Sequence, residues 1–397
     1  MTPEQYPAHW TNPKLKYVAS LRSGEGITSD DIADTGDHPV FGGNGIRGYT
    51  SSYTHDGTYP LIGRQGALCG NINYASGKFW ASEHAVVVRV HLGHDVRWLG
   101  QVLGSMDLNQ YSQSAAQPGI SVEVIENLPV PVPPWPEQQA IANFLDRETA
   151  RIDGLIAEKE RMLALLEEKR AALISRVVTR GLDPKAPLKP SGLEWLGEIP
   201  AHWRVERAKN LFAVRDQRSE DGSEELLTVS HITGVTSRSE KDVYMFEADD
   251  KAGYKRCMPG DLAINTLWAW MGAMGISPLE GIISPDYHVY TSKGQLLPAY
   301  IELLCRSRPF VAEVNRWSKG VWSSRLRLYP ENFFEMRLPV PPEGEQREIV
   351  RAVEADQHKA NALRDTLQLS IRLAKERRAA LITAAVTGQI PIEEMGS

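Results

Sequence analysis

The sequence predicts an α+β protein in which two mixed α/β globular domains are separated by two long helices that pair as an antiparallel coiled coil. Three observations support this prediction. Two long stretches with a helical spacing of apolar residues each follow a stretch of mixed character, the two helical stretches repeat each other without a gap, and a short motif recurs ahead of each mixed stretch. The halves are therefore expected to form a pseudo-two-fold repeat. The expected bounds are 1–135 and 193–342 for the domains, 136–181 and 343–389 for the helices, and 182–192 for a linker.

The first long helix is expected from Glu137 to Arg180, a stretch that has no proline and a single glycine, Gly154. Its apolar residues recur at steps of three and four, which is typical of an amphipathic helix with a narrow apolar seam. At about 1.5 Å per residue it would be roughly 65 Å long, too long for one compact domain to cover, so it needs a partner helix. The expected seam residues are Ile141, Phe144, Leu145, Ile152, Leu155, Ile156, Met162, Leu163, Leu166 and Leu173.

The second long helix repeats the first. Glu345-Gln346 follows Glu137-Gln138 at an offset of 208 residues (345 − 137 = 208), and the motifs Pro-Val-Pro-Pro, Arg-Ala-Ala-Leu-Ile and Val-Thr recur at the same offset. Two copies of one narrow seam are expected to bury each other. The motif Pro-Ala-His-Trp also occurs twice, at 7–10 and at 200–203. The whole plan of globular segment and long helix is thus present in two copies.

The globular segments are expected to combine short strands and short helices. Apolar runs rich in β-branched and aromatic residues are bounded by Gly, Asn, Asp and Ser, as strands are. Gly181 can end the first long helix, and the three prolines that follow within 182–192 indicate a linker. The expected strands are Tyr59–Gly63, Ala85–Val90, Leu226–His231 and His288–Thr291, and the expected short helices are Trp98–Met106 and Leu297–Ser307.

Composition narrows the class of protein. A chain of 397 residues is long enough for two or three domains. No apolar run approaches the roughly 20 residues of a membrane span, and no basic-then-apolar signal opens the sequence. The three cysteines are scattered and odd in number, which argues against a disulfide framework and for a reducing compartment. We therefore expect a cytoplasmic protein that has no membrane contact and holds no metal.

The charge balance gives no direct sign of nucleic acid. The net charge is −6, residues 1–135 hold 8 Lys/Arg against 12 Asp/Glu, and residues 199–342 hold 18 of each. A basic surface must therefore come from the placement of individual charges.

The sequence contains no catalytic or cofactor-binding arrangement. Residues 43–48 match G-x-G-x-x-G, and 41–45 match the F-x-G-x-G of adenosylmethionine-dependent methylases. Both motifs need a helix after the glycine loop, so that amides at the helix N-terminus meet the ligand. Here strand and turn residues follow instead. We expect no catalytic residue and no cofactor on this chain.

The candidate binding residues of the first half are polar side chains in glycine-rich loops. Asn44 and Arg47 lie in the glycine loop just described, and Arg64 and Gln65 follow an expected strand. Arginine can pair with guanine and glutamine or asparagine with adenine at base edges. Gln117 lies in a polar, uncharged loop, 112–119.

The second half has counterparts of these loops. Asn265, Trp268 and Trp270 follow the corresponding strand, and Tyr287 precedes the next one. These aromatic side chains could stack on bases or sugars, although a tryptophan is more often buried in a core. The loop 318–327 is the most basic polar loop and is a candidate for phosphate contact. Its candidate residues are Lys319, Trp322, Ser323 and Arg325.

Taken together, these motifs resemble the specificity (S) subunit of Type I restriction–modification enzymes. The resemblance rests on Gly181, Pro184, Pro187 and Ser191-Gly192, on the run Trp195–Trp203, on the two Pro-Pro…Glu-Gln helix openings, and on the repeated Arg-Ala-Ala-Leu-Ile. It covers essentially the whole chain.

The resemblance implies a DNA-recognition subunit that has no catalytic site of its own. Each globular domain would be a target-recognition domain that reads one half of a bipartite, asymmetric double-stranded DNA target. The helices would set the spacing between the halves and dock two methylase subunits for N6-adenine methylation. Adenosylmethionine, ATP and magnesium would be bound by partner subunits, and the sequence leaves open whether two motor–nuclease subunits join the complex.

Two alternatives remain at this point. The chain could be a DNA-recognition module of another defence or methylation system. It could also be a non-catalytic scaffold whose coiled coil organises other proteins, which the acidic charge balance would suit. The target sequence and the spacer length cannot be read from the residues.

Overall fold

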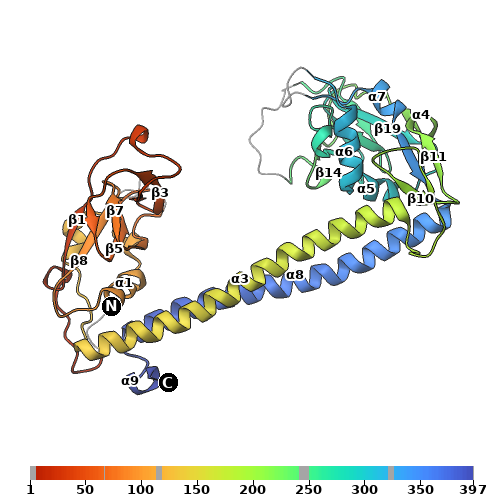
Figure 1. The fold of residues 1–397 in the computed structure, drawn as a ribbon. Coiled ribbons are helices and arrows are strands. Elements are labelled where there is room, and N and C mark those ends of the chain that lie inside the picture. The colour runs from red at the N-terminus through yellow and green to blue at the C-terminus, as the bar shows by residue number, and fades with distance from the viewer. Residues whose placement is uncertain (1–5, 67, 113–118, 241–249, 321–325, 397) are drawn as a thin grey trace. The chain divides into compact units, whose positions relative to one another are not determined.

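The computed structural model describes residues 6–66, 68–112, 119–240, 250–320 and 326–396. The chain forms two compact units, of which the first comprises 1–160 with 368–397 and the second comprises 161–367. Each unit contains one globular domain together with segments of both long helices (Figure 1).

The globular domain of the first unit is built on two four-stranded sheets. One sheet is antiparallel, with the strand order β1-β8-β5-β6, and the other has the order β3-β2-β7-β4, with β2 and β7 parallel. The expected strands at 59–63 and 85–90 are confirmed as β5 and β8. The strands are β1 (Ala19–Ser23), β2 (His38–Gly42), β3 (Gly45–Thr50), β4 (His55–Asp56), β5 (Tyr59–Gly63), β6 (Ile72–Ala75), β7 (Lys78–Ala81) and β8 (Ala85–Val90).

The helix α1 (Val96–Ser105) packs on the first sheet. Its buried side chains Trp98, Leu99 and Leu103 join Ile62 and Val86 of the sheet in one hydrophobic core. The helix begins after Asp95, whose carboxylate accepts hydrogen bonds from two backbone amides of the first turn, as an N-cap does. The shorter helical segments of this domain are Leu15–Tyr17, Ser29–Asp31, Leu108–Tyr111 and α2 (Val122–Glu126).

The globular domain of the second unit repeats the first sheet. Its central antiparallel sheet has the order β12-β19-β16-β17, so β16 and β19 take the places of β5 and β8. Two-stranded pairs β11–β20, β13–β14 and β15–β18 surround it. The strands are β11 (Arg204–Arg207), β12 (Phe212–Val214), β13 (Leu227–Ser230), β14 (Gly234–Ser237), β15 (Lys255–Cys257), β16 (Leu262–Ile264), β17 (Met274–Ile276), β18 (Gly281–Ile283), β19 (His288–Ser292) and β20 (Arg337–Val340).

The described part of the second domain also contains helices, of which α5 takes the place of α1. Tyr300, Ile301 and Leu304 of α5 lie in the same core as Leu262 and Tyr290 of the sheet. The helical segments are α4 (Ala208–Leu211), the short turn η5 (Ala269–Met271), α5 (Pro298–Arg306), α6 (Arg308–Trp317) and α7 (Pro330–Glu335).

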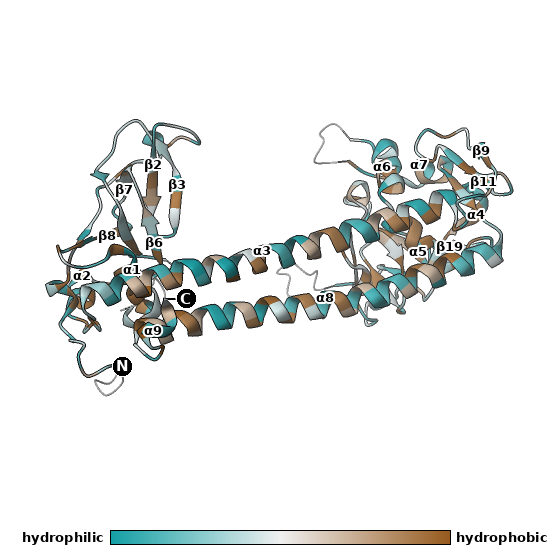
Figure 2. Cartoon of the chain, turned by 60° about the horizontal axis from the view of Figure 1, so that its bottom comes forward, coloured by the Kyte–Doolittle hydropathy of each residue, from teal (hydrophilic) through white to brown (hydrophobic). Residues whose placement is uncertain are grey.

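The two long helices are α3 (Trp135–Arg180) and α8 (Glu343–Val386), close to their expected bounds. In each unit their segments lie side by side and antiparallel, as the sequence predicts (Figures 1 and 2). In the first unit Arg378 pairs with Asp153 at 2.8 Å. In the second, Arg364 pairs with Glu167. The chain ends in a short helix, α9 (Ile392–Met395), whose Met395 is buried in the core of the first unit.

The buried seam is narrower than predicted. Ile152 and Ile156 are buried, but Leu155 is 53% exposed and Met162 is 42% exposed. The buried or half-buried positions on α3 alternate at steps of four and three, through 152, 156, 159, 163 and 166. Because Leu155 and Met162 each lie one residue before such a position, they flank the seam and do not enter it. Their assignment to the buried seam was therefore wrong.

In each unit the Pro-Ala-His-Trp motif contacts the Glu-Gln motif at the start of the long helix. In the first unit the indole Nε1 of Trp10 donates to a carboxylate oxygen of Glu137 at 2.9 Å. In the second unit Trp203 donates to Glu345 at the same distance. The adjacent histidine of each Pro-Ala-His-Trp motif also contacts the same carboxylate. Each copy of the motif thus closes its domain onto the start of the long helix that follows.

A glutamine follows each of these two glutamates, and its side chain binds the N-terminal end of a short helix in the same domain. The side-chain oxygen of Gln138 accepts the backbone amide of Asp95 at 2.9 Å, and that of Gln346 accepts the amide of Leu297 at 2.8 Å. Each of these amides belongs to the residue that caps α1 or α5. Both glutamines are buried, and each also donates to a proline carbonyl five residues earlier. The Glu-Gln repeat therefore anchors each domain to its long helix.

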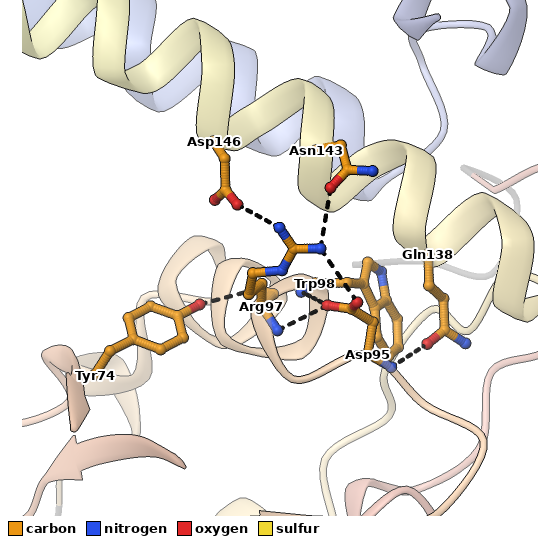
Figure 3. A network of polar contacts seen from close by, with 7 residues as sticks. All are labelled: Tyr74, Asp95, Arg97, Trp98, Gln138, Asn143 and Asp146. Atoms are coloured by element: carbon orange, nitrogen blue, oxygen red, sulfur yellow. Dashed lines mark hydrogen bonds and ion pairs between the residues drawn. The ribbon is translucent and has the colours of Figure 1, made fainter. Parts of the chain in front are cut away.

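A polar network reinforces this anchor in the first unit (Figure 3). Arg97 of α1 donates to Asp146 at 2.7 Å and to Asn143 at 3.0 Å, both on α3. Tyr74 of β6 donates to the carbonyl of Arg97 at 2.9 Å. Sheet, short helix and long helix are thereby joined through one residue.

Part of the expected linker forms a β-strand. Its residues Leu188–Pro190 form β9, which pairs with β10 (Glu198–Pro200). Gly181 ends α3 with a positive φ of 72°, and a Cβ atom there would lie 2.7 Å from a carboxylate oxygen of Glu345. Glycine is therefore required at this close approach. Within the described part of the chain, no helix combines the length and apolarity that spanning a membrane would need.

Candidate nucleic-acid interface

The glycine loop of the first domain is the tip of a β-hairpin. Gly43 and Asn44 connect β2 to β3, and Gly45 has a positive φ of 94°. The loop leads into β3 and not into the helix that the two cofactor-binding motifs need. The tip lies directly against the end of β5, since a Cβ atom on Gly63 would be only 2.2 Å from the carbonyl oxygen of Gly43. Two glycines thus allow this contact between backbones.

This contact creates an open hollow of about 600 Å³ in the first domain. The hollow brings together three of the candidate residues, Asn44, Arg47 and Gln65, which come from the hairpin and from the loop after β5. It also includes His84, which the sequence analysis did not select. The signal for His84 was its place directly before β8, beside the loop that carries Gln65. We call this set of four residues the first-domain hollow.

The polar groups of the first-domain hollow are oriented by their neighbours. Asn71 donates a hydrogen bond to the side-chain oxygen of Asn44 at 3.0 Å. The aliphatic part of the Arg47 side chain lies over Gly42, because a Cβ atom there would be 2.4 Å from Cδ of Arg47. Arg47 itself is exposed. The hollow therefore offers amide and guanidinium groups, which can form hydrogen bonds with base edges or phosphates.

Arg64 lies outside the first-domain hollow. It is half-buried and donates to the hydroxyl of Ser23 at 3.2 Å. With Gln65 it lines a smaller neighbouring hollow of about 360 Å³, beside Gly119 and Ser121. Gln117 precedes this segment but lies outside the described residues.

A second large hollow in the same domain has the opposite character. It measures about 610 Å³ and is lined by Asp30, Asp31 and Asp37 together with Trp80. None of its lining residues is a lysine or an arginine. Because DNA carries a dense negative charge, this surface would repel it. Electrostatics therefore favour the first-domain hollow as the surface that meets nucleic acid.

In the second domain the candidates Asn265, Trp268 and Trp270 lie on the loop between β16 and β17. Trp268 is 48% exposed and its ring stacks on that of Trp270, with ring centres 6.1 Å apart. The indole of Trp270 donates to the carbonyl of Leu267. Asn265 is only 5% exposed, and its amide nitrogen donates to the hydroxyl of Tyr287 at 2.9 Å and to the carbonyl of Val229. Asn265 and Tyr287 support the loop from inside, whereas Trp268 faces solvent.

We call the loop 265–273 the tryptophan loop. The basic loop of the second domain starts and ends beside it. Lys319 and Arg327 exchange two backbone hydrogen bonds of 2.9 Å, and both residues are exposed. The amide of Leu328 donates to the carbonyl of Thr266, two residues before Trp268. The candidates Trp322, Ser323 and Arg325 lie outside the described residues. Arg327, which the sequence analysis did not select, adds a second cation at this place.

Next to Tyr287 lies a basic pair made of the buried Lys255 and the half-buried His288. Lys255 donates from Nζ to the carbonyl of Tyr287 at 2.6 Å and lies 3.4 Å from Nδ1 of His288. Burial, reinforced by the Lys255 ammonium, lowers the pKa of His288 to about 4. Burial also lowers the pKa of Lys255. The imidazole is therefore neutral near pH 7, and its protonation would place two cations side by side.

This pair predicts an acid sensitivity of the second domain. In the unfolded chain the pKa of His288 returns to about 6.5, so the unfolded state binds more protons between pH 6.5 and 4. The free energy of unfolding therefore has its full value, as far as His288 is concerned, above pH 6.5. It decreases as the pH falls from 6.5 toward 4. The midpoint of thermal unfolding of the full chain, measured at intervals from pH 7.5 to 4.5, should fall less steeply in His288→Gln than in the wild type. If the unfolding midpoint fell equally steeply with pH in both proteins, the pKa of His288 would not be lowered in the folded state.

The comparisons with known proteins agree with this architecture. A family model described as the Type I restriction modification DNA specificity domain matches residues 7–162. The EcoprrI specificity subunit of a Type I restriction enzyme from Escherichia coli is 44% identical over 137 residues, which cover 34% of each chain. A putative Type I specificity subunit from Haemophilus influenzae is 23% identical over 350 residues, or 86% of each chain.

The chain is therefore similar to Type I specificity subunits, and its residues 7–162 match the model of their DNA specificity domain. Two solved structures share its fold at 15% identity and 97% coverage of this chain. One, from a study of complex assembly and conformational transition of the type I restriction–modification system, has a TM-score of 0.71 and is covered to 99%. The other, the HsdS subunit of Thermoanaerobacter tengcongensis, has a TM-score of 0.52 and is covered to 98%. The stretch that is similar to the E. coli relative covers about a third of that protein's length.

Proposed function

We propose that this chain is the specificity subunit of a Type I restriction–modification complex, that it recognises DNA for the complex, and that it performs no chemistry itself. The observation that carries the proposal is the first-domain hollow, where three polar residues chosen for base recognition lie together on an open surface that has no acidic residue in its lining. The two sheets of equivalent strand order support the idea that each domain recognises one half of a bipartite target.

Each domain would use its own chemistry. In the first domain, Arg47 would pair with guanine or phosphate, and Asn44 and Gln65 would form hydrogen bonds with base edges. In the second, the exposed ring of Trp268 would pack against sugar or bases, and Lys319 with Arg327 would contact phosphate. Because the described residues of both surfaces include few cations, a large share of the phosphate contact would come from partner subunits. We expect the isolated chain to bind DNA weakly.

The paired helices would set the spacing between the two half-sites and dock two methylase subunits. These subunits would bind adenosylmethionine and methylate one adenine in each half-site, and ATP and magnesium would belong to motor–nuclease subunits where those are present. The cytoplasmic location expected from the cysteines suits this role.

Two pairs of exposed leucines that the repeat relates to each other support the docking of two identical partners. Leu155 and Leu373 lie in the first unit, and Leu363 and Leu165 lie in the second. They are 43–53% exposed. The repeat offset of 208 relates Leu155 to Leu363 and Leu165 to Leu373, so both units carry an equivalent pair. Apolar residues kept on an exposed helix surface at repeated positions are typical of an interface.

The decisive experiment reconstitutes the chain with the methylase subunit encoded beside it. Modified bases are then mapped in the DNA of a host that carries both genes. The proposal expects one bipartite motif with a methylated adenine in each half, and specific DNA binding by the complex in a gel shift. Methylation without a bipartite motif, or a pattern unchanged when this chain is omitted, would sink the proposal.

The leucine pairs give a separate prediction about docking. Leu155→Asp with Leu373→Asp should remove one bound methylase and leave the other, because each buried leucine contributes roughly 1.5–3 kcal/mol to an interface, and two are lost. Native mass spectrometry counts the bound subunits. Leu92→Asp, which changes a fully exposed leucine of the first domain, is the matched control. Two bound methylases in the folded double variant would refute this docking surface.

A further inference from the structure

Arg306, near the end of α5, ties together two loops of the second domain. Its Nη1 donates to the carbonyl of His231, in the turn between β13 and β14, at 3.1 Å. The same nitrogen lies 3.5 Å from the carbonyl of Gly272, and Nη2 donates to the carbonyl of Met274, both at the end of the tryptophan loop. Nε donates to Glu302 of the same helix at 2.7 Å. One guanidinium group therefore holds two separate loops and one carboxylate.

The surrounding backbone leaves room for this guanidinium. A Cβ atom on Gly234 would lie 2.9 Å from Nη2 of Arg306, and a Cβ atom on Gly275 would lie 2.7 Å from it. Gly234 also has a positive φ of 68°. Any side chain at either position would displace the arginine or the strand that carries the glycine. The site is thus shaped around Arg306, whose side chain is only 18% exposed.

Both loops that Arg306 joins carry apolar side chains that are exposed to solvent. In the turn between β13 and β14, Ile232 is 75% exposed, and in the other loop Trp268 is 48% exposed and Met271 is 38% exposed. A hollow of about 390 Å³ is lined by His231, Met271 and residues of α6. Exposed apolar side chains on two loops held at one place are typical of a contact surface.

We propose that Arg306 is a positioning residue that assembles the turn 231–233 and the loop 265–273 into one DNA-recognition surface. This inference rests on the proposed function and deepens it, because it adds Ile232 to the surface and names the group that places Trp268. Arg306 itself touches no DNA. Arginine suits the task because its planar group offers five donors in a fixed geometry, whereas lysine offers a single compact ammonium.

The test compares Arg306→Gln and Arg306→Lys in the full chain assembled with its methylase subunits. Hydrogen exchange should become faster in 230–234 and 265–274 of Arg306→Gln and stay unchanged in the first domain. Discrimination between the correct and an altered second half-site should fall roughly two- to thirty-fold, the range seen for residues that act without touching the ligand. Discrimination at the first half-site should stay the same. Arg306→Lys should fall between Gln and wild type.

The controls separate failure of this inference from failure of the proposed function. Arg347→Gln removes an exposed ion pair on α8 and should change neither readout. Trp268→Ala should lower second-half-site discrimination without faster exchange in 230–234. Unchanged exchange in Arg306→Gln, or faster exchange with full discrimination, would overturn the role of Arg306 alone. Full discrimination by Trp268→Ala and by Ile232→Ala would overturn DNA contact by this surface, and the inference with it.

Discussion

Deletion of residues 157–163 together with their repeat counterparts 365–371 is expected to shorten the unspecified spacer of the DNA target. Each helix loses seven residues, or about 10 Å, which corresponds to roughly three base pairs. A deletion of seven keeps the alternation of four and three along the seam, so both helices can still pair. It also spares Leu155, Leu165, Leu363 and Leu373, the leucines of the two repeat-related pairs. The bases of the two half-sites should stay the same.

Mapping of modified bases in the host measures this change directly. A spacer shorter by three base pairs also turns one half-site by roughly 100° about the duplex axis, so the variant is expected to bind more weakly than the wild type. Deletion from α3 alone is the control, because it puts the seams out of register and should lower the midpoint of thermal unfolding. An unchanged spacer in a folded double-deletion variant would show that the helices do not set the spacing.

Substitutions in the first-domain hollow are expected to abolish recognition of one half-site only. Arg47→Ala and Gln65→Ala should each cost about 1–3 kcal/mol of discrimination, or roughly five- to 150-fold, which is the usual worth of a bidentate base contact. Combined, they should remove one half of the methylation motif and leave the other. Arg22→Gln removes an exposed arginine of β1 and is the matched control for charge.

The shape of the same hollow can be tested without removing any polar group. Gly63→Ala would bring a Cβ atom within 2.2 Å of the carbonyl oxygen of Gly43 and must displace the hairpin tip. It should therefore reduce first-half-site discrimination as strongly as Arg47→Ala. Gly26→Ala meets no atom within 4 Å and is the matched control. If Gly63→Ala and the two side-chain variants all keep the full motif, the first half-site is recognised elsewhere.

Most of the fold could be predicted because its signals are local and doubled. The bounds of α3 and α8 follow from apolar spacing and from the glycine or proline at their ends, and the repeat identifies the second helix as the partner of the first. Strands β5 and β8 have their expected bounds because glycine and polar turns delimit each apolar run. The prediction wrongly placed Leu155 and Met162 in the buried seam, because amphipathic spacing alone does not distinguish a seam position from its flank.

The candidate site was harder to predict because it depends on contacts between distant segments. Side-chain chemistry pointed to Asn44, Arg47 and Gln65, but it pointed equally to Asn265, whose amide is used inside the domain. His84 and Arg306 are not part of any sequence motif that would have indicated a role. Their roles follow from which backbone segments approach each other, and the residue type alone does not contain that information.

The sequence by itself determined the duplicated plan, the two helices, their antiparallel pairing and the kind of chemistry in the loops. Periodicity and repeats encode these features in near neighbours and in internal comparison. Only the tertiary structure decided that each Trp of the Pro-Ala-His-Trp motif meets the Glu of its own domain's helix, and that Gly43 rests on Gly63 to form the hollow. Such contacts join residues far apart in the chain, and they depend on the space that small residues leave between backbones.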